Sequence, residues 1–108
     1  MIDDAKLTAL IENDIMSFKD VSRFPDIGLS GNIQRAIGRD IPENGIKITD
    51  EDDGLTISCE LIVYFGVNIP QLCYDIQTKV KGDVEKLTGL TVKAVNIKVD
   101  GIDKRTDN

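Results

Sequence analysis

Residues 66–101 decide the fold of the chain, and they read GVNIPQLCYDIQTKVKGDVEKLTGLTVKAVNIKVDG. The first part carries an apolar stripe at three- and four-residue steps, formed by Ile69, Leu72, Cys73, Ile76, Val80, Val84 and Leu87. This spacing predicts one amphipathic helix. The Asn68 side chain can cap the first turn of this helix, and Pro70 lacks an N–H that the first turn would leave unpaired anyway. Gly89 can adopt the left-handed backbone that is common just after the last turn. Gly82 inside the helix costs about 1 kcal/mol relative to alanine, which suggests the close approach of another element.

The residues after Gly89 change from a helical period to a period of two. The apolar members of the alternation are Val95, Ile97 and Val99. They predict a strand with one buried face. Val92 and Ala94 fall on the opposite parity, so either both faces are covered at the start of the strand or a bulge near Ala94 shifts its register.

The chain before this stretch opens with a predicted helix and a connection. Residues 1–20 carry apolar side chains at helical spacing, and their acidic face, which includes Asp14, is expected to be a solvated surface rather than a metal site. Residues 21–45 hold four of the nine glycines and two of the three prolines. This composition predicts a long glycine-rich connection.

A β-hairpin follows the connection. Residues 45–49 and 55–65 alternate apolar and polar side chains, and the acidic turn 50–54 between them ends in Asp-Gly, a strong hairpin signal. Ile62 and Tyr64 place apolar side chains on the otherwise polar face of the second strand. Either the connection or a neighbouring strand covers them, or they form an exposed patch that contacts a partner. We therefore treat these two residues as candidate partner contacts.

The order of elements is helix, strand, strand, helix, strand. It predicts a small α+β domain in which helices pack on one face of a three-stranded sheet. Residues 1–108 are expected to form this single domain, with its core in 46–101 and a short polar, disordered tail at 104–108. A chain of this length buries enough surface to fold without disulfides or metal.

Composition and charge restrict the partners of the protein. The net charge is −6, and 30% of the residues are charged. This acidic balance disfavours nucleic acid and anionic lipid, which attract basic surfaces. No apolar run approaches the ~20 residues of a spanning helix, so direct membrane insertion is not expected. The first ten residues, MIDDAKLTAL, lack the features of a signal peptide, which predicts a cytoplasmic protein.

The reactive side chains in the sequence disfavour an enzymatic function. The chain has no histidine and two cysteines, Cys59 and Cys73, so most zinc sites and all histidine-dependent nucleophile schemes are excluded. Both cysteines fall in apolar registers and are expected to be small buried side chains rather than reactive thiols. A disulfide would require their two faces to meet. No catalytic, cofactor-binding or metal-binding residue is predicted.

One loop offers an alternative function. Gly28–Gly31 reads Gly-Leu-Ser-Gly, and a Gly-x-x-G loop before a helix clamps the backbone of single-stranded nucleic acid in KH domains. The loop contains no lysine or arginine, and the isoleucine at position 33 comes one residue too early for that motif. A KH-like nucleic-acid-binding domain is therefore the alternative hypothesis.

Several short motifs occur in an order that resembles the alkaline-shock-protein family, the cell-envelope stress response proteins of Gram-positive bacteria. These motifs are Gly66-Val67-Asn68-Ile69-Pro70, Gln77 with Val80, Thr88-Gly89-Leu90 with Val92, and Val95-Asn96-Ile97-Lys98-Val99-Asp100-Gly101. The resemblance implies a non-enzymatic cytoplasmic protein of the alkaline or envelope stress response. It also implies self-association, or a membrane-anchored protein partner that holds the chain near the membrane. The family has no catalytic residues that could be assigned to positions of this chain.

Overall fold

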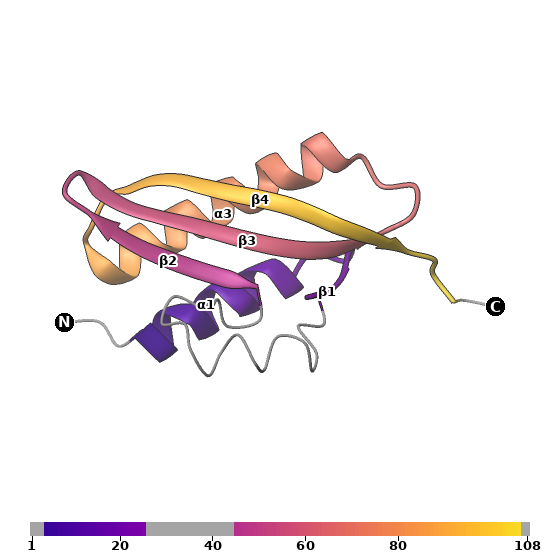
Figure 1. The fold of residues 1–108 in the computed structure, drawn as a ribbon, viewed down its shortest axis with the longest axis horizontal. Helices are drawn as coiled ribbons and strands as arrows, with labels where there is room; N and C mark the ends of the chain where they lie inside the picture. Colours follow the sequence, from indigo (N-terminus) through magenta and orange to yellow (C-terminus); the bar gives the residue numbers. More distant parts are fainter. Residues whose placement is uncertain (1–3, 26–44, 107–108) are drawn as a thin grey trace, which may run out of the picture.

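The computed structural model describes residues 4–25 and 45–106. The loop Gly28–Gly31, on which the nucleic-acid hypothesis depends, lies outside these ranges. The described residues form two helices and four strands, labelled in Figure 1, which are α1 (Asp4–Met16), β1 (Val21–Arg23), β2 (Ile46–Glu51), β3 (Gly54–Tyr64), α3 (Ile69–Thr88) and β4 (Val92–Asp103). The predicted α+β class and the predicted order of the main elements are confirmed. The sheet has four strands rather than the three predicted, because β1 lies at the start of the segment 21–45, which the sequence predicts to be a connection.

The four strands form one mixed sheet around β3. On one edge of β3, β2 pairs antiparallel from Ile46 opposite Cys59 to Glu51 opposite Gly54. The short β1 pairs antiparallel further along the same edge, with Val21 opposite Val63. On the other edge, β4 runs parallel to β3 along nearly its whole length, and α3 provides the crossover between them (Figure 1). Parallel neighbours require such a crossover.

The hairpin turn is tighter than the five-residue turn predicted from the sequence. Asp50 and Glu51 pair with Leu55 and Gly54, so only two residues connect β2 to β3. The last pair of this ladder includes Gly54, whose backbone adopts a φ of +142°, a conformation that residues with a Cβ rarely adopt. The Leu55 N–H donates a hydrogen bond of 2.8 Å to the Thr91 carbonyl, which joins this end of the hairpin to the start of β4.

Two irregularities shift the register of β4. Leu55 pairs with Val92 and Thr56 pairs with Ala94, so one residue of β4 is left over between them. The parity change seen in the sequence is therefore a bulge, the second of the two alternatives. A second shift follows Val99, which leaves Asp100 as an extra residue. Beyond it the parity of β4 is reversed.

The core lies between one face of the sheet and the two helices. The inward side chains of β3 are almost completely buried, and they are Leu55, Ile57, Cys59, Leu61 and Val63. They join the buried residues of α1 and α3 in one cluster, which includes Ile11, Ile15, Ile76, Val80 and Val84. The prediction that the helices pack on one face of the sheet is thus confirmed.

Helix α3 has the ends that the sequence predicts. The Asn68 side chain accepts a hydrogen bond of 3.2 Å from the Gln71 N–H, and Gly89 closes the helix with a φ of +73°. The buried stripe of α3 is shorter than predicted, because Leu87 in the last turn is 46% exposed. Cys73 is half-buried, and both cysteines are free.

Asp14 of α1 does not lie on a solvated surface, contrary to the expectation from its acidic neighbours. The residue is 6% exposed and faces α3, where the Lys79 Nζ lies 3.9 Å from its Oδ1. Its Oδ2 has no hydrogen-bond partner among the described residues. Burial, together with the neighbouring Asp83 carboxylate, raises the pKa of Asp14 to about 6, and Lys79 opposes this shift. The helix interface therefore contains a carboxyl group that is costly to ionise.

The Gly82→Ala variant is expected to be more stable than the wild type. The sequence suggests that another element approaches Gly82, but a Cβ built there meets nothing within 4 Å in the described structure. The substitution should therefore stabilise the domain by about 0.5–1 kcal/mol, the difference in helix propensity between glycine and alanine. Thermal unfolding of the two proteins measures it. A loss of stability would show that a segment outside the described ranges packs on this side of α3.

Candidate interaction surface

The outer edge of β4 is a candidate interaction surface. Among the described strands, β4 pairs only with β3. Backbone groups of successive strand residues point alternately to the two sides, so every second residue of β4 faces away from β3. The Val95 carbonyl accepts a hydrogen bond of 2.8 Å from the Gln77 side chain of α3, which identifies Val95 as an outward residue. Ile97 and Val99, in unbroken register with it, are outward as well.

Helix α3 seals the first half of this edge. The Val92 N–H donates to the Glu85 carboxylate at 2.8 Å, and the Val92 carbonyl accepts from the Lys81 ammonium at 2.7 Å. Lys81 and Glu85 also form an ion pair of 2.8 Å. The hydrogen bonds that Glu85 accepts from the Lys81 ammonium and from the Val92 N–H lower the pKa of Glu85. With Gln77, these side chains form a row at four-residue spacing along one side of α3.

The second half of the edge is open. Ile97 and Val99 direct an N–H and a carbonyl outward, and the described part of the chain supplies no partner for these groups. Beyond the bulge at Asp100, the Asp103 carbonyl points inward because it accepts from the Phe65 N–H at 2.8 Å. Ile102 is therefore the next outward residue, and its side chain is 56% exposed. Unpaired strand edges of this kind are sites for pairing with another strand.

Charged side chains of both signs flank the open half of the edge. The Lys98 Nζ lies 3.7 Å from the Asp100 Oδ1, and the Lys98 side chain is 73% exposed. On β3, Glu60 lies beside them, and interaction with the Asp100 carboxylate is the main cause that raises the pKa of Glu60. The Lys98 ammonium is thus an exposed positive charge next to two neighbouring carboxylates, those of Glu60 and Asp100.

The two residues predicted as partner contacts lie on the sheet face opposite the helices. Ile62 is only 7% exposed, and its Cδ1 would lie 3.0 Å from a Cβ at Gly101. Tyr64 is half-buried, and the Arg105 guanidinium carbon lies over its ring, 4.2 Å from the centroid of the Tyr64 ring. Arg105 belongs to the tail expected to be disordered, yet it is held by an ion pair of 2.9 Å to Asp20. Contact of a partner with Ile62 and Tyr64 stays a prediction.

The chain is similar to a known protein family over residues 4–104. The model of the alkaline shock protein 23 family, described by a cell envelope-related function, matches residues 4–104. The chain belongs to this family. The resemblance seen in the short motifs is thereby confirmed, and it extends over α1 as well.

Relatives of the chain occur in Gram-positive bacteria. The uncharacterized protein YqhY of Bacillus subtilis (strain 168) is 34% identical over 58 residues, which cover 54% of this chain and 43% of the relative. The uncharacterized protein YloU of the same strain is 36% identical over 58 residues, 54% of this chain and 48% of the relative. The chain thus spans about half the length of these curated relatives. No solved structure matches the chain.

Within this family member, the two thiols are poor nucleophiles. Burial raises the pKa of the Cys59 thiol to about 12 and also raises the pKa of Cys73. Because the thiolate is the reactive form of cysteine, both shifts lower the reactivity of these thiols. Residues 4–25 and 45–106 contain no cluster of three potential metal ligands.

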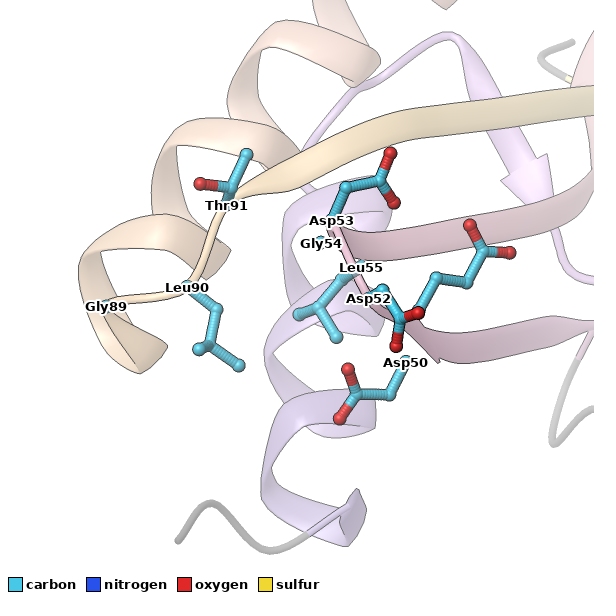
Figure 2. Close-up of a pocket in the computed structure, with 9 residues that line it drawn as sticks. Asp50, Asp52, Asp53, Gly54, Leu55, Gly89, Leu90 and Thr91 are labelled. Atoms are coloured by element: carbon cyan, nitrogen blue, oxygen red, sulfur yellow. The ribbon is translucent and has the colours of Figure 1, made fainter.

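The acidic hairpin turn lines a hollow of about 360 Å³ (Figure 2). Asp50, Asp52 and Asp53 line one side of it, and Gly89 and Leu90 line the opposite side. Lys93 of β4 neutralises part of this charge, because its Nζ lies 2.7 Å from Glu51 and 3.1 Å from Asp53. These interactions raise the pKa of Lys93 and lower the pKa of Asp53. The ion pairs with Lys93 therefore give Glu51 and Asp53 of this acidic turn a role within the fold.

Neither described helix of this family member has the length and apolar character needed to cross a membrane.

Proposed function

We propose that this member of the alkaline shock protein family is a non-enzymatic protein of the envelope or alkaline stress response that acts by binding other protein chains. Its partner is a second copy of itself or a membrane-anchored protein, and the chain works in the cytoplasm next to the membrane. The single observation that carries the proposal is the half-open edge of β4. Helix side chains seal one half and leave the other half with free backbone groups.

The chemistry of the described residues supports binding rather than catalysis. Its two thiols have raised pKa values. The other strongly perturbed group, Asp14, lies in a helix interface, where a substrate would have to separate α1 from α3 to reach it. Perturbed groups at active sites are instead expected in an accessible cleft.

The solution mass of the full chain across a concentration series tests the proposal. Light scattering after size exclusion should show a mass that rises above the 11.9 kDa of one chain as the concentration increases toward roughly 1 mM, the range of weak association. In parallel, the tagged chain should recover an integral membrane protein from cross-linked cells that produce it. A constant mass of one chain together with no recovered partner would contradict the proposed function.

A further inference from the structure

We propose that a second copy of this chain pairs its own β4 antiparallel with the open half of β4, with Val99 of one copy opposite Val99 of the other. The inference rests on the proposed function, because it names the occupant and the register of the same edge. It makes the sheets of two copies continuous across a twofold axis.

The backbone supports this pairing. In an antiparallel ladder, two opposite residues that both point toward the other strand exchange two hydrogen bonds. Val99 is such an outward residue, so two copies of Val99 can exchange bonds across the axis. The bulge at Asp100 makes Ile102 the next outward residue after Val99, and Ile97 is the one before it. Ile97 of each copy therefore meets Ile102 of the other.

The charges favour this register over its neighbour. With Val99 on the axis, Lys98 of each copy lies across from the bulge that contains Asp100 of the other, and this contact occurs twice. Moving the axis to position 98 would place two Lys98 side chains opposite each other, and like charges directly opposite are destabilising. Lys98 can reach the carboxylate of the second copy because its side chain is 73% exposed and its ion pair with its own Asp100 is long, at 3.7 Å.

The exposed apolar surface agrees with the backbone and the charges. Ile102 is 56% exposed at the edge of the sheet, where a large apolar side chain is an aggregation hazard. In the proposed register it packs on Ile97 of the second copy, which is half-buried on the same face of the sheet. The row Gln77, Lys81 and Glu85 limits how far the second strand extends, because these side chains already bond to Val92 and Val95. A closed dimer is expected at this edge.

Two charge variants test the register. In Lys98→Asp both positions 98 and 100 are acidic, and in Asp100→Lys both are basic. Each variant alone should dimerise about tenfold or more weakly than the wild type, because two attractive contacts become repulsive. An equimolar mixture of the two variants should form heterodimers, since every opposing pair then has opposite charges. Light scattering and a heterodimer-specific cross-link between differently tagged chains measure this. Circular dichroism checks that each variant is folded.

A backbone variant tests the edge itself. Val99→Pro removes the outward N–H at the axis without removing a bond to β3, so it should abolish dimerisation while the domain stays folded. Thr106→Pro, beyond the end of β4, is the matched control and should dimerise like the wild type. Association that is unchanged in Val99→Pro, or a mixture of charge variants that fails to reassociate, would overturn the register while self-association itself stands. A wild-type chain that is monomeric at every concentration would overturn both.

Discussion

Gly54→Ala is expected to destabilise the domain by about 3 kcal/mol, combining a backbone strain of roughly 1–3 kcal/mol with a forced displacement of β4. The φ of Gly54 is +142°, and a Cβ there would lie 2.6 Å from the Thr91 carbonyl oxygen. That oxygen accepts the Leu55 N–H and cannot move without breaking the first link between the hairpin and β4. Urea unfolding followed by circular dichroism measures the loss.

Gly66→Ala is the matched control for Gly54→Ala. Gly66 also has a positive φ, +90°, but a Cβ there meets nothing within 4 Å. It should therefore lose only the cost of the left-handed backbone, about 1–2 kcal/mol. Equal losses in the two variants would mean that the contact with Thr91 contributes nothing and that backbone strain alone explains Gly54.

Asp14→Asn is expected to stabilise the domain above neutral pH, by up to about 3 kcal/mol. The pKa of Asp14 in the folded protein is raised from 3.8 to about 6, chiefly by burial, so folding favours the protonated carboxyl. Its stabilising contribution is complete below about pH 4 and is lost as the pH rises through about 6. Asparagine has nearly the same shape as the protonated acid and does not ionise. The variant should therefore gain most at pH 8 and almost nothing at pH 4.

Thermal unfolding of wild type and Asp14→Asn between pH 4 and pH 8 tests this expectation. The wild-type stability should fall between about pH 4 and 6 relative to the variant, and the difference should then level off. Asp52→Asn, which removes an equal charge from the exposed hairpin turn, controls for the change in net charge. A variant that is less stable than the wild type at pH 8 would show that the ionised carboxylate and Lys79 form a favourable pair.

The parts of the fold that local sequence determines were predictable. The caps of α3 at Asn68 and Gly89 depend on residues adjacent in the chain, and the change of period after Gly89 locates β4. The strand β1 has three residues, Val-Ser-Arg, which are too few for a period to appear. Leu87 matches the apolar stripe, yet it is exposed, because burial of the last helical turn depends on how far the core extends.

The interaction surface was less predictable than the fold. Ile62 and Tyr64 stand out in the sequence because they break an alternation, and the structure explains Ile62 by its contact with Gly101 after a bulge. Gln77 stands out in the sequence only as part of a family motif, and nothing in its position along the helix indicates that its side chain bonds to β4. Its role depends on a carbonyl 18 positions away along the chain. Such a contact becomes visible only when helix and strand are placed together.

The parallel crossover also governs the order in which the protein is assembled during synthesis. The β2–β3 hairpin can form within roughly 10 μs of leaving the ribosome. The second edge of β3 stays unpaired until β4 is made. β4 ends at Asp103, 39 residues after Tyr64, and synthesis of these residues at ~5–20 residues per second takes roughly 2–8 s. During that interval the central strand of a nascent chain has an open side. Crowded ribosomes on one message would hold several such strands close together, so we expect slow translation of α3 to favour mispairing between neighbouring chains.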